Sequence, residues 1–300
     1  MTSRRRTAAV ALLLGLGAAG CSTSGGTAAP GPAPLPTPRP FQGVTHYPEP
    51  ERRALHTAEE ELVAACMKRR GFTYRPQPLA TGDHLSDVSP YGLIGVAQAV
   101  DDGYGITSTA LSLRRPADAN AAEGANARWK EALLGTPAHR VNLAMPMKRE
   151  FYYHADSCVS DAKSRLFGPD YYRLFNTFQV LGDAVVERVR ADPRYLAAQR
   201  AWSTCMKAAG TTARAFGDPQ ARIDADLRKA GRDPAAVHAV AGTELRLSRA
   251  DADCQAGAGL TTVVTAVQKD AERILGAGHG ADLTALRALR ERALRTAAKG

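Results

Sequence analysis

Four cysteines constrain the fold most strongly, because two of them stand in the same short motif. Residues 61–72 read ELVAACMKRRGF and residues 200–211 read RAWSTCMKAAGT, so both contain Cys-Met-Lys-x-x-Gly. In each motif the cysteine lies near the end of a helical pattern, and the glycine takes a C-cap position. One further cysteine follows each motif: Cys158 comes after Cys66, and Cys254 comes after Cys205.

This repetition predicts two units that each close on themselves, with disulfides Cys66–Cys158 and Cys205–Cys254. The number of cysteines after residue 50 is even and they form no Cys-x-x-Cys, which favours disulfides in an exported chain. Loop entropy gives each disulfide a stabilisation of about 4–5 kcal/mol, which strain can reduce. A crossed pairing and reduced, buried thiols are the alternatives.

The first 21 residues are typical of an exported lipoprotein. Three arginines at 4–6 precede an apolar run over 8–20, which is too short to span a bilayer and suits a signal peptide. The run ends Ala18-Ala19-Gly20-Cys21, which resembles the lipobox of bacterial lipoproteins. We therefore expect a signal peptide over 1–20 and lipidation of Cys21. A plain secretory peptide with an incidental Cys21 is the alternative, and Sec and Tat export both stay open.

Residues 21–49 are expected to be the lipidated cysteine and a tether. Proline occupies every second position from Pro30 to Pro40, which favours polyproline II without a packed core. Residues 1–20 carry three arginines and no acid, so their removal lowers the formal net charge from +9 to +6. A mild positive excess suits an anionic envelope surface, and no nucleic-acid partner is expected.

The rest of the 300-residue chain predicts a mainly α fold, a helical bundle in two disulfide-closed units over 50–190 and 191–300. A hydrophobic content of 44% supports a core, and aromatic residues at 6% argue against a β-sandwich. Three Asp-Pro pairs predict helix starts, because Asp suits the N-cap and Pro the first helical position. A short irregular or extended segment is expected near 72–115, with 106–113 extended. Helices are expected over 51–70, 93–100, 118–134, 154–167, 171–190, 194–209, 220–230, 235–276 with a bend near 257–259, and 282–298.

A search for catalytic and metal-binding patterns yields no site. No two of the seven histidines lie within one helical turn, and Gly-x-Ser-x-Gly does not occur. Ser160 and Lys163 match Ser-x-x-Lys, but the Lys-Thr-Gly and Ser-Asp-Asn partners are missing, so an exposed polar helix face is expected. We predict no catalytic residue, no metal site and no cofactor.

Three further groups of charged residues have a structural and a functional interpretation. Glu59–Glu61 are expected to form a solvated helix start rather than a glycosidase pair. Asp156 and Asp253 precede the second cysteine of each unit, and capping or ion pairing is expected rather than a paired functional site. The last helix carries a basic side, expected to be solvated rather than bound to anionic lipid or wall polymer, formed by Arg287, Arg290, Arg292, Arg295 and Lys299.

Several segments resemble a group of actinobacterial, especially streptomycete, lipoproteins and secreted proteins of unknown function with repeated Cys-Met-x-x-x-Gly motifs. In order along the chain they are CMKRRGFTYRPQP (66–78), YGLIGVAQAVDDGYGI (91–106), WKEALLG (129–135), SCVSDAKSRLFG (157–168), WSTCMKAAG (202–210), and Glu244 with Ala252-Asp253-Cys254. The resemblance covers most of residues 50–300. It implies an extracytoplasmic location and disulfides, and it implies no reaction.

Two functions are consistent with the sequence. The first is a non-catalytic binding protein, lipid-anchored on the outer face of the cytoplasmic membrane, whose partner is an envelope protein or a cell-wall polymer. The second is a lipid-anchored envelope hydrolase with an unrecognised site. A cleft gathering Asp156, Asp253, Tyr104 and a histidine would favour the hydrolase.

Overall fold

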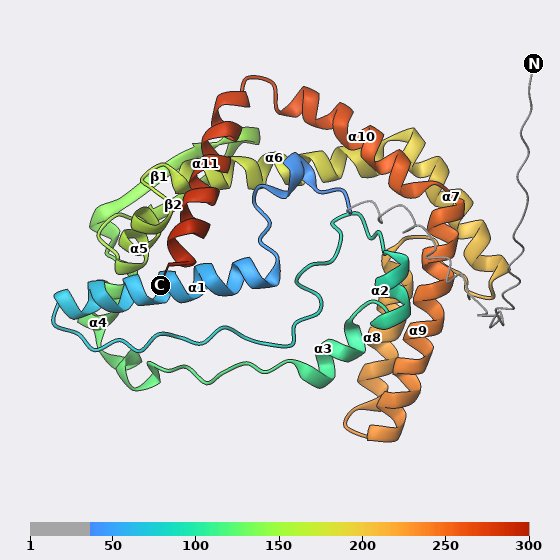
Figure 1. Ribbon diagram of the computed structural model, residues 1–300, viewed down its shortest axis with the longest axis horizontal. Coiled ribbons are helices and arrows are strands. Elements are labelled where there is room, and N and C mark those ends of the chain that lie inside the picture. Colours follow the sequence, from blue (N-terminus) through green and yellow to red (C-terminus); the bar gives the residue numbers. More distant parts are fainter. Residues whose placement is uncertain (1–36, 300) are drawn as a thin grey trace, which may run out of the picture. The chain divides into compact units, whose positions relative to one another are not determined.

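A computed structural model describes residues 37–299 (Figure 1), so the predicted signal peptide, Cys21 and most of the predicted tether lie outside the described residues. The helices are α1 (Glu49–Arg69), α2 (Val96–Asp101), α3 (Ile106–Ser112), α4 (Ala127–Leu134), α5 (Cys158–Leu166), α6 (Tyr171–Ala191), α7 (Pro193–Ala208), α8 (Gly217–Ala230), α9 (Pro234–Gly257), α10 (Leu260–Leu275) and α11 (Gly280–Ala297). The strands are β1 (Arg140–Met145) and β2 (Arg149–His154). Short 3-10 helices cover Pro40–Gly43, Ala121–Ala125, Pro137–His139 and Pro146–Lys148. The predicted mainly α fold is confirmed.

The secondary structure differs from the sequence-based prediction in three segments. Residues 106–113, expected to be extended, form α3. The helix expected over 118–134 is shorter, because 3-10 helix Ala121–Ala125 precedes α4 and Asn126 caps the latter by accepting from the Trp129 N–H. The helix expected from 154 begins at Cys158, because β1 and β2 form an antiparallel hairpin in which Arg140 lies opposite His154. The bend expected near 257–259 is present as a break between α9 and α10, where Gly259 adopts a φ of 63°.

The larger core is shared by both predicted units. Helix α6 packs against α10 and α11, and α7 packs against α9 and α10. This hydrophobic cluster draws buried side chains from both predicted units, with Phe178 and Trp202 among its largest members. The predicted boundary at residue 190 therefore falls between two helices of a common core, and residues 37–299 belong to one compact unit.

Both predicted disulfides are confirmed. Cys66 bonds to Cys158 with a Cα–Cα distance of 5.5 Å, and Cys205 bonds to Cys254 with a Cα–Cα distance of 5.6 Å. The first joins α1 to α5 inside a small cluster that includes Val63, Met67 and Trp129. The second joins the end of α7 to α9.

The repeated motif produces the same helix ending twice. At the end of α1, the Gly71 N–H donates to the Lys68 carbonyl and the Phe72 N–H donates to the Met67 carbonyl. At the end of α7, Gly210 donates to Lys207 and Thr211 donates to Met206 in the same pattern. These are Schellman motifs, which need a left-handed residue, and Gly71 and Gly210 supply φ values of 82° and 83°.

One polar face of α9 holds segment 92–107, which contains the short helix α2 and the start of α3. Glu244, which is 2% exposed, accepts hydrogen bonds from the N–H groups of Tyr104, Ile106 and Thr107 at 2.9–3.0 Å. This carboxylate caps α3 from another helix, which is why residues 106–112 become helical after Gly105. Gln255 accepts from the Ile94 N–H and donates to the Gly92 carbonyl, both at 3.1 Å.

Asp251 is the most buried acid of this face. It is fully buried and accepts hydrogen bonds from Tyr104 Oη at 2.9 Å, Trp202 Nε1 at 2.8 Å and Gln255 Nε2 at 2.8 Å. Burial raises the pKa of Asp251, and these three donors oppose that rise. Helix α10 holds residues 39–41, which precede α1, in a similar way. Gln268 donates to the Arg39 carbonyl, and Glu272 accepts from the Phe41 N–H. The polar faces of α9 and α10 thus hold segments 92–107 and 39–41 in place through side-chain hydrogen bonds to the backbone.

None of the helices within residues 37–299 is both long enough and apolar enough to cross a membrane.

Candidate functional site

The segment 82–89 separates two hollows in the surface. The first, here called the acidic cavity, has a volume of about 390 Å³ and is lined by Glu49, Gly82, Asp83, His84, Asp87, Gln98 and Asp102. The second, here called the apolar groove, has a volume of about 310 Å³ and is lined mainly by Leu85, Val88, Leu93, Ile94, Tyr104 and Ile106, with Gln98, Gln220 and Asp224 among its polar members. Both volumes are typical of small-molecule sites, and Gln98 borders both hollows.

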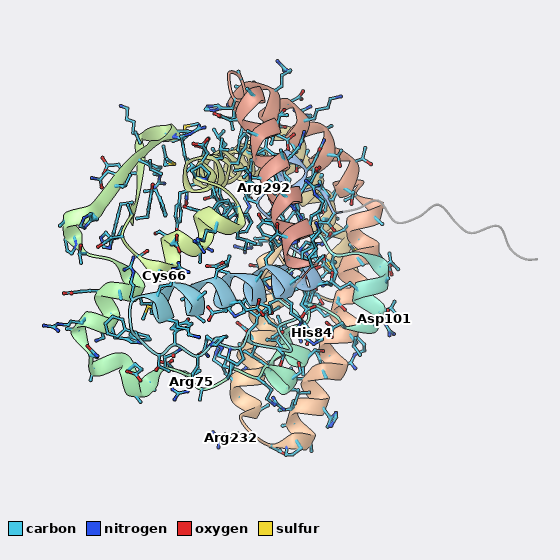
Figure 2. All side chains as sticks on the ribbon, turned by 60° about the vertical axis from the view of Figure 1, so that its left-hand side comes forward. Cys66, Arg75, His84, Asp101, Arg232 and Arg292 are labelled. Carbon is cyan, nitrogen blue, oxygen red and sulfur yellow. A yellow bond between two sulfur atoms is a disulfide. The ribbon has the colours of Figure 1, made fainter. Side chains whose placement is uncertain are left out.

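Close packing against α3 holds this segment in place. A Cβ atom on Gly82 would lie 2.3 Å from the Ser112 carbonyl oxygen, and one on Gly105 would lie 2.9 Å from the His84 Cβ. The His84 N–H donates to Thr109 Oγ1 at 3.0 Å. Figure 2 shows His84 beside the N-terminal end of α1, where Glu49 begins that helix. Both glycines also have positive φ, so larger residues are excluded by conformation as well as by space.

His84 and Asp102 form a hydrogen-bonded pair within the acidic cavity. His84 Nδ1 lies 2.8 Å from Asp102 Oδ2, and the Ser108 hydroxyl donates to Asp102 Oδ1. The His84 side chain is about two-fifths exposed, at 41%. A carboxylate that accepts from Nδ1 fixes the orientation of an imidazole and leaves Nε2 for other partners.

The remaining carboxylates of the acidic cavity differ in how their negative charge is compensated. Asp87 Oδ1 lies 3.2 Å from His46 Nε2 and 3.9 Å from Arg52 Nη1, and Glu49 forms an ion pair with Arg53. Asp83 Oδ1 accepts from the Leu85 N–H at 3.0 Å. Within residues 37–299, neither Asp83 nor Asp102 has a lysine or arginine partner. The acidic cavity therefore retains negative charge.

The apolar groove combines exposed apolar walls with an unpaired acceptor. Leu85 is 39% exposed and Val88 is 45% exposed, while Tyr104 and Ile106 below them are buried. Among the described residues, the Gln220 Oε1 atom is buried and lacks a hydrogen-bond donor. Because this oxygen is buried, it does not open onto the groove, although Gln220 itself lines it. Asp224 lies one helical turn further along α8 and pairs with Arg228 at 3.6 Å.

The residues that the sequence suggested for chemistry are not brought together. Ser160 is buried and its N–H donates to Ser157 Oγ, so the expected exposed polar face is wrong there. Lys163 Nζ instead pairs with Glu59 at 2.6 Å. The helix start expected at Glu59–Glu61 is also wrong, because α1 begins ten residues earlier at Glu49, and of the three only Glu61 is exposed. Glu60 accepts from Tyr74 Oη and the Gln77 N–H.

Asp156 and Asp253, which precede the second cysteine of each predicted unit, lie in different environments. Asp156 accepts from the Thr136 N–H at 3.0 Å and from Thr136 Oγ1 at 2.8 Å, which is the expected structural role. Slight burial opposes its charge, but these hydrogen bonds and nearby His139 lower the pKa of Asp156. Asp253 is exposed, and Tyr104 bonds to Asp251 instead. The contacts of the described residues thus do not gather Asp156, Asp253 and Tyr104 with a histidine.

The basic side of the last helix is partly engaged within the protein. Arg290 donates to the Gly43 carbonyl at 2.8 Å and pairs with Glu51 at 2.5 Å, so the solvated face expected there is wrong for this residue. Arg292 donates to the Phe167 carbonyl, and Arg287 donates to Gln42 Oε1 at 2.8 Å. These arginines fasten α11 to the segments that precede α1 and follow α5.

His84, Asp102 and Gln220 were missed by sequence reasoning, because they are far apart in the chain and match no motif. The adjacent Asp-Asp-Gly-Tyr-Gly at 101–105 was the available signal, since it marks a turn with close packing. Within residues 37–299 no three His, Cys, Asp or Glu side chains are grouped so as to hold a metal ion. No protein-family model matches the chain, and it has no significant match among curated proteins or solved structures.

Proposed function

We propose that this chain is a cell-envelope lipoprotein, anchored by Cys21 on the outer face of the cytoplasmic membrane, with a non-catalytic binding role. The observation that carries the proposal is the pair of disulfides, Cys66–Cys158 and Cys205–Cys254. Disulfides persist in oxidising compartments and are rare in the cytosol, so they support export. The sequence that ends at Cys21 supports the anchor, and two acyl signals or more make such anchoring stable.

The binding role is supported by the surface around segment 82–89. Glycine packing and hydrogen bonds to α3 hold this segment in place, and it presents polar residues to one hollow and apolar residues to the other. A rigid surface of this kind binds a partner without a large entropic cost. We propose that the partner is a component of the envelope, either a protein or a wall polymer.

Anchoring is tested by Cys21→Ser in the native host. We expect this variant to leave the membrane fraction or to accumulate as an unprocessed precursor, whereas Cys205→Ser in the same background should remain membrane-bound. Membrane retention of Cys21→Ser together with normal cleavage would contradict the lipoprotein assignment.

Binding is tested by a photo-crosslinking residue at position 88, with position 100 as the control. Val88 and Val100 are 45% and 44% exposed, and only Val88 lines the apolar groove. We expect an envelope component to be captured from position 88 alone. Equal capture from both positions would indicate contact without a site.

The His84–Asp102 pair favours a second candidate, an envelope hydrolase in which His84 acts as general base and Asp102 orients it. Hydrolysis of an envelope ester or amide that disappears in His84→Gln, while the fold persists, would replace the binding role by this activity.

A further inference from the structure

We propose that the outer edge of β2 pairs with the same edge of a second copy of this chain. The two hairpins would then form one four-stranded antiparallel sheet around a two-fold axis at Tyr152. This inference goes beyond the proposed binding role, because no residue of the hairpin lines the acidic cavity or the apolar groove.

The backbone of β2 carries the first step, because its outer edge is open. The Ala155 N–H donates to the His139 carbonyl at 2.9 Å and so continues the ladder between the two strands. Bonded and non-bonded pairs alternate in an antiparallel ladder, so the odd-numbered residues of β2 bond to β1. The peptide groups of Glu150, Tyr152 and His154 therefore point away from β1. Within residues 37–299, no other backbone group bonds to those of Glu150 and Tyr152.

The side chains of β2 leave this edge accessible. Phe151 and Tyr153 lie on the inner face, where both rings stack on Tyr172 of α6 with centroids 5.7 and 4.5 Å apart. Glu150 is exposed on the outer face, and Tyr152 beside it is 51% exposed. The hairpin lies at the periphery of the molecule (Figure 1), and β2 contains no proline that would protect its edge. An open edge of this kind is a template for a further strand, and two strands alone form only a marginal sheet.

Charge complementarity carries the second step and favours a second copy as the occupant. With the axis at Tyr152, Glu150 of each copy lies opposite His154 of the other. His154 Nδ1 donates to the Leu134 carbonyl at 3.0 Å, which leaves Nε2 for this carboxylate. Glu150 has no ion-pair partner in the described part of its own chain. Opposite charges that face each other on paired strands stabilise the pair, and β2 supplies both in the order that an antiparallel copy requires.

The neighbouring registers lose this match. An axis at residue 151 places Glu150 opposite Tyr152, which carries no charge. An axis at residue 153 places Glu150 opposite Asp156, so that two carboxylates face each other. The axis at Tyr152 instead places Lys148 opposite Asp156, which adds a second attraction beyond the ends of the strands.

The outer-face cation of the hairpin does not oppose the pairing. The Arg140 guanidinium lies 3.8 Å from the centroid of the Tyr152 ring, and its Nε donates to Asn142 Oδ1 at 2.8 Å. Arg140 belongs to β1, so it is one strand further from the axis than Tyr152. The two guanidiniums of a pair are therefore separated by both copies of β2.

Cross-linking tests the position of the axis in the exported, oxidised chain that also carries Cys21→Ser. A residue on the axis faces its own copy with Cα atoms about 5.5 Å apart, which suits a disulfide. We expect Tyr152→Cys to form a covalent dimer in oxidised glutathione. Asn142→Cys is the control, because it is exposed on the same face but belongs to β1, and it should remain monomeric. Equal dimer yields from the two variants, or no dimer from Tyr152→Cys, overturn the proposal.

A mixing experiment tests the register. Glu150→Cys and His154→Cys should each give little dimer alone, because neither residue faces itself across the axis. The two variants should cross-link when they are mixed. Cross-linking of either variant alone to the same extent as the mixture overturns this register.

Sedimentation velocity tests the pairing without a cross-link. Tyr152→Pro removes an N–H that points away from β1, and we expect it to weaken the dimer at least about tenfold. Asn142→Pro is the matched control, because Asn142 lies opposite Tyr152 and its N–H points to the other edge of the hairpin. Circular dichroism checks that both variants fold. Equal weakening by the two prolines, or an unmodified fold that stays monomeric at every concentration, overturns the proposal.

A different occupant would also be recognised. If Tyr152→Cys captures another envelope protein in the native host and no second copy, the edge serves a different partner and the proposal fails. Cross-linking from position 88 tests the binding role separately, so the two proposals stand or fall independently.

Discussion

The two disulfides close regions that begin with the same motif but differ in what surrounds the sulfur atoms. Cys66 and Cys158 are 2% and 0% exposed, and they form the centre of the small cluster around Trp129. Cys254 is buried but Cys205 is exposed, and the second disulfide lies at the edge of the large core. The first disulfide therefore forms part of the small core of its region, whereas the second joins α7 to α9 at the edge of the large core.

The aromatic residue beside each disulfide shows how this difference arises. In the second region Trp202 lies three residues before Cys205 and is fully buried against Phe216 and Asp251. In the first region Val63 takes the corresponding position, and Trp129 enters from α4 with its Nε1 donating to the Thr73 carbonyl at 2.8 Å. In the first region the indole thus comes from α4, a helix that carries neither cysteine of the disulfide.

Removal of the disulfides should give the largest difference between the two regions. Loop entropy alone predicts a loss of about 4–5 kcal/mol for either one, because the separations of 92 and 49 residues enter only logarithmically. We expect Cys66→Ala with Cys158→Ala to cost about 1–2 kcal/mol more than Cys205→Ala with Cys254→Ala, since it also leaves a cavity in the small cluster. Guanidinium unfolding of the two double variants and the unmodified chain measures this, and equal losses would show that the cluster does not depend on its disulfide.

Substitution of Asp251 should give the next effect. Asp251→Leu leaves Tyr104 Oη, Trp202 Nε1 and Gln255 Nε2 without an acceptor in the core, and we expect a loss of at least about 3 kcal/mol. Asp251→Asn keeps an oxygen for two of these donors and removes an unpaired buried charge, so its stability at neutral pH should be close to that of the unmodified chain. A large loss in Asp251→Asn would show that the charge itself is required.

The pH dependence of the two regions should have opposite signs. Burial raises the pKa of Asp251, so the folded state holds its proton more tightly than the unfolded state does. The stability of the unmodified chain relative to Asp251→Asn should therefore fall as pH rises through the raised pKa of Asp251.

In the first region, hydrogen bonds from Thr136 lower the pKa of Asp156 against a slight effect of burial. The stability of the unmodified chain relative to Asp156→Asn should therefore be lost as pH falls from the pKa of Asp156 in the unfolded chain to its lowered pKa in the folded chain. Unfolding free energies measured from pH 3 to pH 7 test both signs, and parallel curves would contradict them.

The two glycines of the repeated motif should give the smallest and most equal effects. A Cβ on Gly71 or Gly210 would meet no atom within 4 Å, so alanine there adds only the strain of a left-handed conformation. We expect Gly71→Ala and Gly210→Ala each to cost about 1 kcal/mol. Thermal unfolding measures both, and a clear inequality would mean that the two helix endings are not equivalent.

Local signals predicted most of the helices and the pairing of the cysteines. Helices α7 and α9 start at Asp-Pro pairs, and α1 and α7 end at glycines. These boundaries depend on residues that are adjacent in the sequence. The start of α3 could not be predicted in this way, because its cap is the carboxylate of Glu244, far away in the chain. The hairpin over 140–154 was missed because each strand has only six residues, although the side chains of β1 alternate in exposure.

The candidate site was still harder to predict than the fold. His84 and Asp102 lie 18 residues apart and meet only because Gly105 lets the backbone approach His84 closely. Gln220 enters the apolar groove from α8, and nothing near it in sequence distinguishes it from a surface amide. Such a site depends on tertiary packing, which single-sequence patterns do not encode.

The dependence of segment 92–107 on α9 also sets the order in which the protein can be completed. Tyr104 reaches its acceptors on Glu244 and Asp251 across 140 and 147 residues, and Gln268 reaches Arg39 across 229. Contacts of such long range form late, so segments 39–41 and 92–107 become ordered only after α9 and α10 have been synthesised. A chain cut anywhere before residue 244 would lack the carboxylate that orders residues 104–107. An ordered segment 92–107 therefore reports that synthesis has passed α9 and that α9 has docked.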